Sequence, residues 1–224
     1  ATMGLNYLRP EQIRSIPTIM GEVDLVKALQ MQPGVSPGLE GLAGMMVRGG
    51  NDDQNLFLID GNPIYQMNHL GGLFSAFNVA AIRDVAFYKS SFPARYGGRL
   101  SSVVDVATQP GDAERYHVNF GIGLTSANLG VSGPIVKGRT SFNIALRRTW
   151  FDVLTTPLLA IANVDAKRNG EKFNAHYAFT DFNLHLNHRT NRWGTFSFVG
   201  YAGQDDISTG TDSWNQSAKT PKDE

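Results

Sequence analysis

The alternation of hydrophobic and polar residues changes near residue 111 of the chain. Before it, short apolar runs such as residues 45–47 and 56–59 are separated by polar, glycine-rich loops, and such runs are typical of strands covered on both faces. Beyond it, apolar and polar residues alternate with a period of two, which is typical of strands with two different faces. The pattern therefore predicts two domains, residues 1–112 and residues 113–224.

The first domain is expected to be of the α+β class. Residues 8–16 predict a short helix, because Pro10 suits a first helical turn. Residues 21–31 predict a longer helix, with Glu22 and Asp24 in its first turn, where acids favour the helix dipole. Four short strands are expected in the rest of the domain, at residues 45–47, 56–59, 84–89 and 102–108. One loop is expected at residues 62–72.

The second domain is expected to consist of about five antiparallel strands. In the first of them, Val118, Phe120 and Ile122 share one face, while the other face carries histidine, asparagine and glycine. The same two faces recur near residues 127–132, 140–147, 181–187 and 195–198. An apolar outside and a polar inside are typical of the strands of a transmembrane β-barrel, although a soluble sheet can alternate in the same way.

The lengths of the connections favour the membrane barrel. A tight turn is expected near residues 125–126, and the links at 133–138 and 190–192 are short, whereas 149–175 forms a long irregular segment and the sequence from 205 on is polar. Transmembrane barrels alternate short periplasmic turns with long outer loops in this way. Because a barrel with a filled lumen goes with roughly 22 strands, the chain is expected to be a fragment of a longer protein.

Composition narrows the classes of protein further. The 224 residues are 42% hydrophobic and carry 20 basic and 20 acidic side chains, so a core can form, but the basic surface of a nucleic-acid-binding protein is missing. There is no cysteine, which excludes disulfides and thiolate chemistry. No apolar run reaches the roughly 18 residues of a spanning helix, and any export signal is expected to have been removed or left out.

Two charged residues stand at the ends of apolar runs in the first domain. Arg48 is followed by Gly49 and Gly50, and Asp60 is followed by Gly61, so each predicted strand stops at a fixed charge beside a permissive backbone. A charge at the end of a buried strand needs a partner or water. Arg48 and Asp60 are therefore candidate functional residues.

Three short motifs occur in a defined order: Val47-Arg48-Gly49, then Leu58-Ile59-Asp60-Gly61, then Tyr96-Gly97-Gly98 ahead of Val103-Val104-Asp105-Val106. In this order they resemble the plug domain of TonB-dependent outer-membrane receptors, over about residues 5–112. Residues 177–198 are similar to early barrel strands of Bacteroidetes-type members. The glycines of these motifs are expected to be turn residues or tight contacts, at Gly49, Gly50, Gly61, Gly97 and Gly98.

The resemblance implies an α+β plug domain inside a large transmembrane β-barrel, in the outer membrane of a Gram-negative bacterium. Its partners would be the lipid bilayer and an inner-membrane energy-coupling protein of the TonB type, its cargo would be a scarce, bulky solute, and no cofactor is expected. Arg48 and Asp60 would lock the plug to the barrel wall, with Arg147 as one candidate partner. Pairing within the plug is the alternative for both charges.

Two loops, residues 50–55 and 62–69, would form the apex of the plug that faces the cargo. Amide, aromatic and imidazole side chains suit polar cargo, and the candidate contacts are Asp53, Gln54, Tyr65, Gln66, Asn68 and His69. An ordinary solvated loop is the alternative. Carboxylate and amide oxygens in residues 51–55 could also hold calcium, but the pattern of a calcium loop is incomplete, so no metal site is predicted.

Enzyme chemistry is not expected. His185 and His188 lie three apart on a predicted strand and face opposite sides, so they do not share a metal. No nucleophile elbow, phosphate-binding loop or dinucleotide fingerprint occurs. Three functions remain: an energised outer-membrane transporter, a receptor-like barrel that acts as a scaffold for a surface lipoprotein, a secretion complex or a motility complex, and a soluble α+β binding module with an attached sheet.

Overall fold

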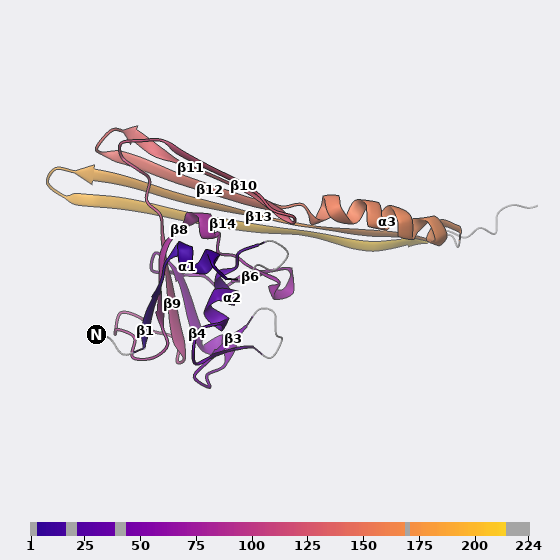
Figure 1. Cartoon of the computed structure of the whole chain (residues 1–224), viewed down its shortest axis with the longest axis horizontal. Helices are drawn as coiled ribbons and strands as arrows, with labels where there is room; N and C mark the ends of the chain where they lie inside the picture. Colours follow the sequence, from indigo (N-terminus) through magenta and orange to yellow (C-terminus); the bar gives the residue numbers. More distant parts are fainter. Residues whose placement is uncertain (1–3, 17–21, 39–43, 169–170, 214–224) are drawn as a thin grey trace, which may run out of the picture.

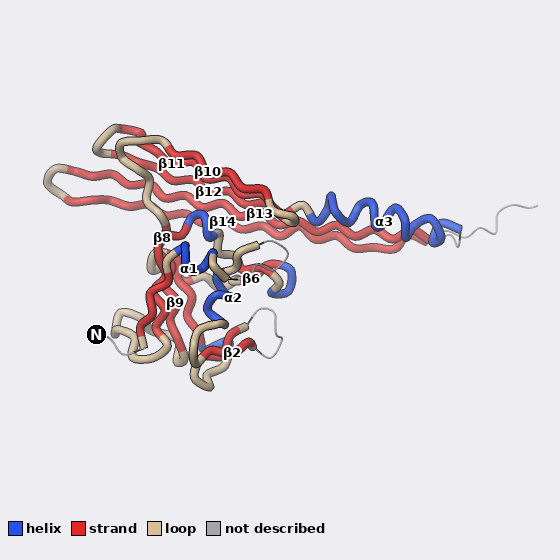
Figure 2. The backbone as a smooth tube through the Cα atoms, in the orientation of Figure 1, coloured by secondary structure: helices blue, strands red, loops and turns tan. Residues whose placement is uncertain are grey.

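Two bodies follow one another along the chain, an α/β domain that ends at Thr108 and a long antiparallel sheet that begins at His117 (Figure 1). The computed structural model describes residues 4–16, 22–38, 44–168 and 171–213. The α/β domain lies against one face of the long sheet, and its own strands run across the direction of the long strands (Figure 2).

A mixed five-stranded sheet forms the centre of the α/β domain. Its strands are β1 (Leu5–Leu8), β4 (Asn55–Ile59), β5 (Asn62–Pro63), β8 (Ile82–Tyr88) and β9 (Ser102–Thr108). Their order is β1-β8-β9-β4-β5, with β4 parallel to β9 and the other pairs antiparallel. The valine-rich run at residues 102–108 is β9, as predicted, and it lies in the middle of the sheet, where both of its faces are buried.

Apolar side chains cover both faces of this sheet. The helices α1 (Pro10–Arg14) and α2 (Leu25–Gln30) pack on one face, where Leu25 and Val85 are fully buried. Tyr96 covers the other face together with neighbouring apolar side chains. Each large apolar side chain buried in this way contributes about 1.5–3 kcal/mol relative to an exposed one, so the two-sided core holds the sheet in place.

The beginning of the domain differs from the prediction. The sequence predicts a helix from residue 8, but residues Leu5–Leu8 form β1 along the edge of β8, and α1 begins only at Pro10. Glu22 and Asp24 precede α2 instead of lying in its first turn. Asp24 is the N-cap of α2, because its carboxylate accepts a hydrogen bond from the backbone N–H of Lys27 (3.1 Å).

The region 62–72 is more regular than the predicted loop. It contains β5, β6 (Asn68–His69), which pairs with β7 (Phe74–Ser75), and the 3₁₀ turn η2 (Leu70–Gly72). Strands of two residues carry no periodicity that a sequence could display. The remaining short elements are β2 (Val35–Pro37), its partner β3 (Met45–Val47), and the 3₁₀ turns η1 (Asp52–Gln54) and η3 (Val79–Ala81).

The long sheet consists of five antiparallel strands that pair in chain order. They are β10 (His117–Ile122), β11 (Ser126–Val136), β12 (Thr140–Thr149), β13 (Glu171–Thr190) and β14 (Gly194–Ser213). The face turned away from the α/β domain is apolar, and Phe120 and Phe198 on it stay 68% and 61% exposed. The opposite face is polar and buries Asn183 and His185. A row of large exposed apolar side chains is unusual for a soluble sheet.

The connection between β12 and β13 is the long one, as predicted, and the other three connections within the sheet are short, but the long one is not irregular. The sequence predicts an irregular segment at 149–175, whereas the structure has the helix α3 (Phe151–Arg168), which packs along the extended part of β13 (Figure 2). The helix contains Pro157 and leaves Leu158 and Ile161 exposed, so its apolar residues do not form a buried stripe. Among the described residues, no helix is long and apolar enough to cross a membrane.

Candidate functional site

The two motif glycines that follow charged residues form turns of one kind. Arg48 and Gly49 have φ values of 49° and 84°, and Asp60 and Gly61 have φ values of 47° and 80°. Positive φ at both central residues is the requirement of a type I′ turn, the common connection of tight hairpins. Both motifs therefore place a charged side chain at the tip of a hairpin, at a backbone conformation that is unfavourable for arginine.

Arg48 lies far from the long strands. Its guanidinium Nη1 donates to Ser90 Oγ (2.8 Å), within the α/β domain. The neighbouring Lys89 donates to the carbonyl of Pro33 (3.0 Å), and burial followed by the charge of Arg48 lowers the pKa of this lysine. The structure thus supports the alternative in which Arg48 is bound within its own domain.

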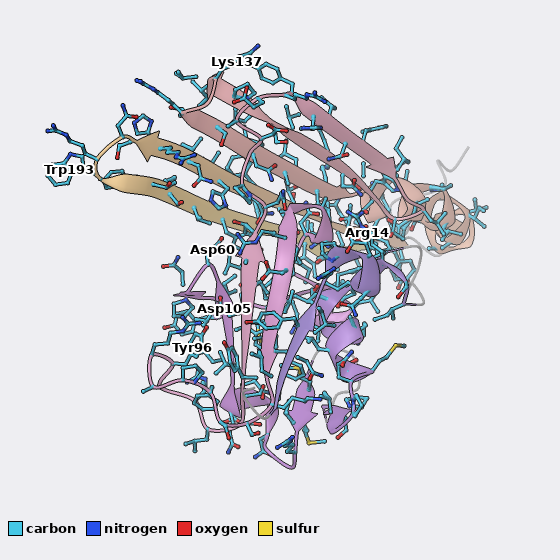
Figure 3. All side chains as sticks on the ribbon, turned by 60° about the vertical axis from the view of Figure 1, so that its left-hand side comes forward. Arg14, Asp60, Tyr96, Asp105, Lys137 and Trp193 are labelled. Atoms are coloured by element: carbon cyan, nitrogen blue, oxygen red, sulfur yellow. The ribbon has the colours of Figure 1, made fainter. Side chains whose placement is uncertain are left out.

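Asp60 stands where the α/β domain meets the long sheet (Figure 3). Its carboxylate accepts hydrogen bonds from the backbone N–H and the hydroxyl of Thr108, at 3.1 and 2.5 Å. The same hydroxyl lies 2.6 Å from Nδ1 of His185 on β13. Asp60 is therefore joined to the barrel-like strands through one intervening side chain.

Arg147 on β12 is the centre of a buried cluster between the two bodies. Its guanidinium is 4% exposed and donates to Oδ2 of Asp181 from Nε (2.9 Å) and from Nη2 (2.5 Å). Nη2 also donates to the carbonyl of Ser75 on β7 (2.6 Å), and Nη1 reaches Oε2 of Glu22 at 3.5 Å. Arg147 therefore does bridge the two bodies, but its partners are Glu22 and Ser75, not the predicted Asp60.

Glu22 and Asp24 hold the domain side of this cluster. Asp24 accepts from the backbone N–H of Ser75 (2.5 Å) while it caps α2, which fixes β7 beneath Arg147. Burial raises the pKa of Glu22, and the nearby Arg147 offsets only part of this rise. A cavity of about 510 Å³ lies beside Glu22 and Arg147, and it is lined by Asn78 and by residues of β10 and β11.

His69 of β6 completes the cluster from the α/β domain. It is 2% exposed, its Nε2 lies 3.0 Å from Oδ1 of Asp181, and its Nδ1 contacts Oδ1 of Asp205 on β14. Its ring stacks on Phe179 with the centroids 4.1 Å apart and the planes 5° from parallel. The prediction placed His69 at an open apex, but the structure buries it, because β6 runs under the strands. We call Glu22, His69, Arg147, Asp181 and Asp205 the interface cluster.

The other predicted apex residues are more exposed than His69 and are not members of the interface cluster. Tyr65 is 85% exposed, Asp53 and Gln66 are exposed, and Gln54 and Asn68 are half-buried. Two of the side chains in residues 51–55 whose oxygens could hold calcium have structural roles. The carboxylate of Asp52 accepts from the backbone N–H of Met45 (2.9 Å), and the amide of Asn55 donates to the carbonyl of Met45 (2.6 Å).

The third motif forms a separate polar site on the outer face of the first sheet. The hydroxyl of Tyr96 donates to Oδ2 of Asp105 (2.7 Å) and accepts from Arg95 (2.7 Å), and burial raises the pKa of Tyr96. Asp105 also accepts from the backbone N–H of Gly61 (3.3 Å). These residues line a cavity of about 460 Å³ that reaches Asp60.

The motif glycines have unequal roles. Gly49, Gly61 and Gly98 have positive φ. Gly50 is a tight contact, since an added Cβ would lie 2.3 Å from Ser101 Oγ. Gly97 has neither property, so the structure gives no reason for a glycine there.

Sequence reasoning missed Glu22, Asp181 and Asp205 as members of the cluster. One signal was available, because Asp181 lies on the predicted polar face of its strand, as Arg147 does, and the two are direct neighbours across β12 and β13. Opposite charges at neighbouring positions of one sheet face attract each other. Glu22 gave no such signal, because its contact depends on how the two bodies meet.

Comparison with known proteins agrees with this geometry. Residues 6–104 match the sequence model of the TonB-dependent Receptor Plug Domain. The chain is also similar to the siderophore receptor PirA from Acinetobacter baumannii, with a TM-score of 0.60 and 18% identity over 92% of this chain and 32% of that chain. A mutant of the ferric enterobactin receptor PfeA from Pseudomonas aeruginosa gives a TM-score of 0.59 and 17% identity over 92% and 33%. Among curated proteins, no match is found.

The matched residues 6–104 coincide with the α/β domain, and both solved structures share the fold of the α/β domain and the long sheet together. The α/β domain is therefore a plug domain of the TonB-dependent receptors, which are outer-membrane proteins of Gram-negative bacteria, and the long sheet has the fold of the strands that accompany such a plug. It spans about a third of the length of the two solved structures. At this level of identity the likeness to them shows the fold alone.

Proposed function

We propose that the receptor containing this chain is an energised transporter that imports a scarce, bulky solute across the outer membrane. An inner-membrane protein of the TonB type would supply the energy by acting on the plug. The observation that carries the proposal is the interface cluster, in which two residues of the plug meet charged side chains of three successive strands.

A charged interface suits a plug that must be held and then moved. An apolar interface would have to expose apolar surface to water when the plug shifts, at about 25 cal/mol for each Å². Charged groups that part in a wet lumen are hydrated instead, so much of the lost interaction is replaced by water. The cavity of about 510 Å³ beside Glu22 supplies room for water at the point where the cluster would open.

The apex of the plug is the proposed place of first contact with the solute. Tyr65 and Gln66 project from the plug without burial, and Asp53 is exposed on the segment that precedes β4. An exposed aromatic ring beside amides can bind a polar solute that has apolar parts. The solved structures named above are a siderophore receptor and a ferric enterobactin receptor, but the solute of this receptor is proposed only as bulky and scarce.

A scaffold for a surface lipoprotein or another surface complex is the second candidate. One observation favours it, since α3 lies at the end of the sheet opposite the turns at 137–139 and 191–193 and leaves Val153, Leu158 and Ile161 more than half exposed. A helix of this kind can dock another protein at the cell surface.

Uptake by cells separates the two functions. The intact receptor is purified in its native state and the small molecules that it retains are identified by mass spectrometry; uptake of that solute is then measured with and without the energy-coupling protein. Energy-dependent uptake that falls when Tyr65 and Gln66 are changed to alanine supports transport. A stoichiometric protein partner combined with no uptake of any retained solute would establish the scaffold instead.

A further inference from the structure

The two ring nitrogens of His69 both face carboxylates. Nε2 lies 3.0 Å from Oδ1 of Asp181, and Nδ1 contacts Oδ1 of Asp205. Asp181 is fully buried, and the side chain of Asp205 is 25% exposed. An ionised carboxylate only accepts hydrogen bonds, and a neutral imidazole has one N–H, so a neutral His69 could satisfy one of these contacts but would set a lone pair against the other.

We propose that His69 is held as an imidazolium, so that the docked plug carries one more proton than the released plug. The inference rests on the proposed function, because it describes how the same interface would be regulated. The geometry carries it: two acceptors on two strands, β13 and β14, require two donors from one ring.

The charged and polar groups around His69 are compatible with a positive charge on its ring. Asp181 receives Arg147 on Oδ2 and the hydroxyl of Tyr201 on Oδ1 (2.9 Å), and Asp205 receives the hydroxyl of Tyr177 (3.3 Å). From the plug, Glu22 and Asp24 lie close to Arg147. With His69 charged, the group contains two cations and four carboxyl groups, and it becomes more negative when His69 loses its proton.

Phe179 places the ring of His69 between the two carboxylates. The stacked rings fix the plane of the imidazole, and the guanidinium carbon of Arg147 lies 5.0 Å from the centre of the same phenyl ring. Both cations therefore contact the same aromatic ring, which favours a positive over a neutral imidazole.

His185 provides a contrast within the same interface. Its Nδ1 contacts the hydroxyl of Thr108 (2.6 Å), and its Nε2 contacts Oδ1 of Asn187 at 3.3 Å. The hydroxyl of Thr108 donates its proton to Asp60 and can accept from Nδ1–H of His185, and the amide of Asn187 can turn over to donate to Nε2, so a neutral ring satisfies both contacts. The requirement for a second proton is thus specific to His69.

The sign of the pH dependence follows from the proton that the docked plug holds. The contribution of His69 to docking is complete at low pH and is lost as the pH rises and the imidazolium gives up its proton. Glu22 acts in the same direction, because burial raises its pKa and its ionisation at higher pH is resisted by the docked state. Docking is therefore expected to weaken towards alkaline pH.

Nitrogen NMR on the intact, reconstituted receptor with labelled histidine tests the charge state directly. The His69 signal is identified by its absence in His69→Gln. At about pH 7.5, where an unperturbed imidazole is mostly neutral, both nitrogens of His69 are expected to be protonated. A spectrum with one protonated nitrogen at this pH would overturn the proposal.

A single cysteine reports the release of the plug. Ala76 is 1% exposed and follows Ser75 directly, and this chain has no cysteine of its own, so the thiol of Ala76→Cys is reached only when the interface opens. Its labelling rate, divided by that of an unfolded peptide thiol at each pH, is expected to rise about tenfold or more between about pH 6 and pH 8.5 as one charge-assisted hydrogen bond is lost.

Two variants decide whether His69 causes that rise. Asp205→Asn is the critical one, because its amide can donate to Nδ1 of a neutral ring; it should keep the plug docked and leave only the part of the pH dependence that Glu22 contributes. His185→Gln, the matched control, should leave the pH dependence as it is. A rise that is undiminished in Asp205→Asn, or that disappears in His185→Gln, would refute the assignment. None of these measurements uses the solute. A failed transport assay would therefore count against the proposed function and not against the assignment of a charged His69.

Discussion

Arg147 and Asp181 form a direct cross-strand pair in which Nε and Nη2 of the guanidinium both donate to Oδ2 of the carboxylate, at 2.9 and 2.5 Å. The pair belongs to the barrel wall, yet Nη2 also donates to the carbonyl of Ser75 in the plug. The plug is therefore docked on a charge pair that the barrel can form by itself. Each charge of the pair keeps its partner when the plug leaves, whereas a lone buried charge would be left without one.

Removing one partner of this pair should cost far more than removing both. In Arg147→Met, Asp181 stays fully buried without its cation, and the loss is expected to be about 3–5 kcal/mol of stability. Arg147→Met combined with Asp181→Asn should recover a large part of this loss. Urea unfolding of the purified receptor, monitored by labelling at position 76, measures both. Equal losses in the single and double variants would contradict the pairing.

Asp60 and Arg48 should differ in their effect on docking. Asp60→Ala leaves the buried N–H and hydroxyl of Thr108 without their acceptor and cuts the connection to His185, so a loss of about 1–3 kcal/mol is expected. Arg48→Ala removes one exposed hydrogen bond to Ser90 within the plug, and little change is expected.

Ion conductance across planar bilayers measures this difference. Leak through the receptor should rise in Asp60→Ala and stay near that of the unchanged protein in Arg48→Ala. Thr108→Val, which removes the hydroxyl between Asp60 and His185, should resemble Asp60→Ala. Equal leak in the two charge variants would mean that Arg48 also contacts the barrel wall.

A charged side chain should be costly on the outward face of the long sheet and nearly without cost on the inward face. Phe120→Lys places a cation on the apolar face, where it costs about 2–4 kcal/mol near the middle of the bilayer. Asn119→Lys, one position away on the opposite face, should be nearly neutral. Yield of folded receptor in the outer membrane compares the two, and equal yields would mean that this face of β10 does not meet lipid.

The sequence predicts what depends on local pattern. Alternation placed the strands of the long sheet, and the apolar runs placed β3, β4 and β9. The glycines that follow Arg48 and Asp60 indicate the turns at Arg48-Gly49 and Asp60-Gly61. Arg147 faces the plug, and its position has the parity of the polar face.

What the sequence could not predict depends on contacts between distant parts. β1 forms because the edge of β8 is free to pair, and two-residue strands such as β6 show no period. His69 has the residue type and the loop setting of a ligand contact, and only the packing of β6 beneath Asp181 and Asp205 reveals a different place. The partner of Arg147 within the plug, Glu22, was assigned to a helix dipole for the same reason.

The turn at Arg48 offers a test of backbone strain that is independent of docking. Arg48 has a φ of 49°, a conformation that costs most residues with a side chain roughly 1–2 kcal/mol but that asparagine tolerates. Arg48→Asn is therefore expected to stabilise the plug by up to about 1 kcal/mol, even though it removes the hydrogen bond to Ser90. Protection of the plug amides from hydrogen exchange in the intact receptor gives the free energy of local opening.

Gly49→Ala is the matched opposite of this change. Gly49 has a φ of 84°, and an added Cβ would meet nothing within 4 Å, so any loss of stability must come from the backbone alone. A loss of about 1 kcal/mol is expected. If Arg48→Asn destabilises the plug as well, the arginine must gain more from its surroundings than the strain costs, and a contact with the part of the barrel beyond this chain becomes the explanation to test. The two changes together thus show whether Arg48 lowers or raises the stability of the plug at this turn.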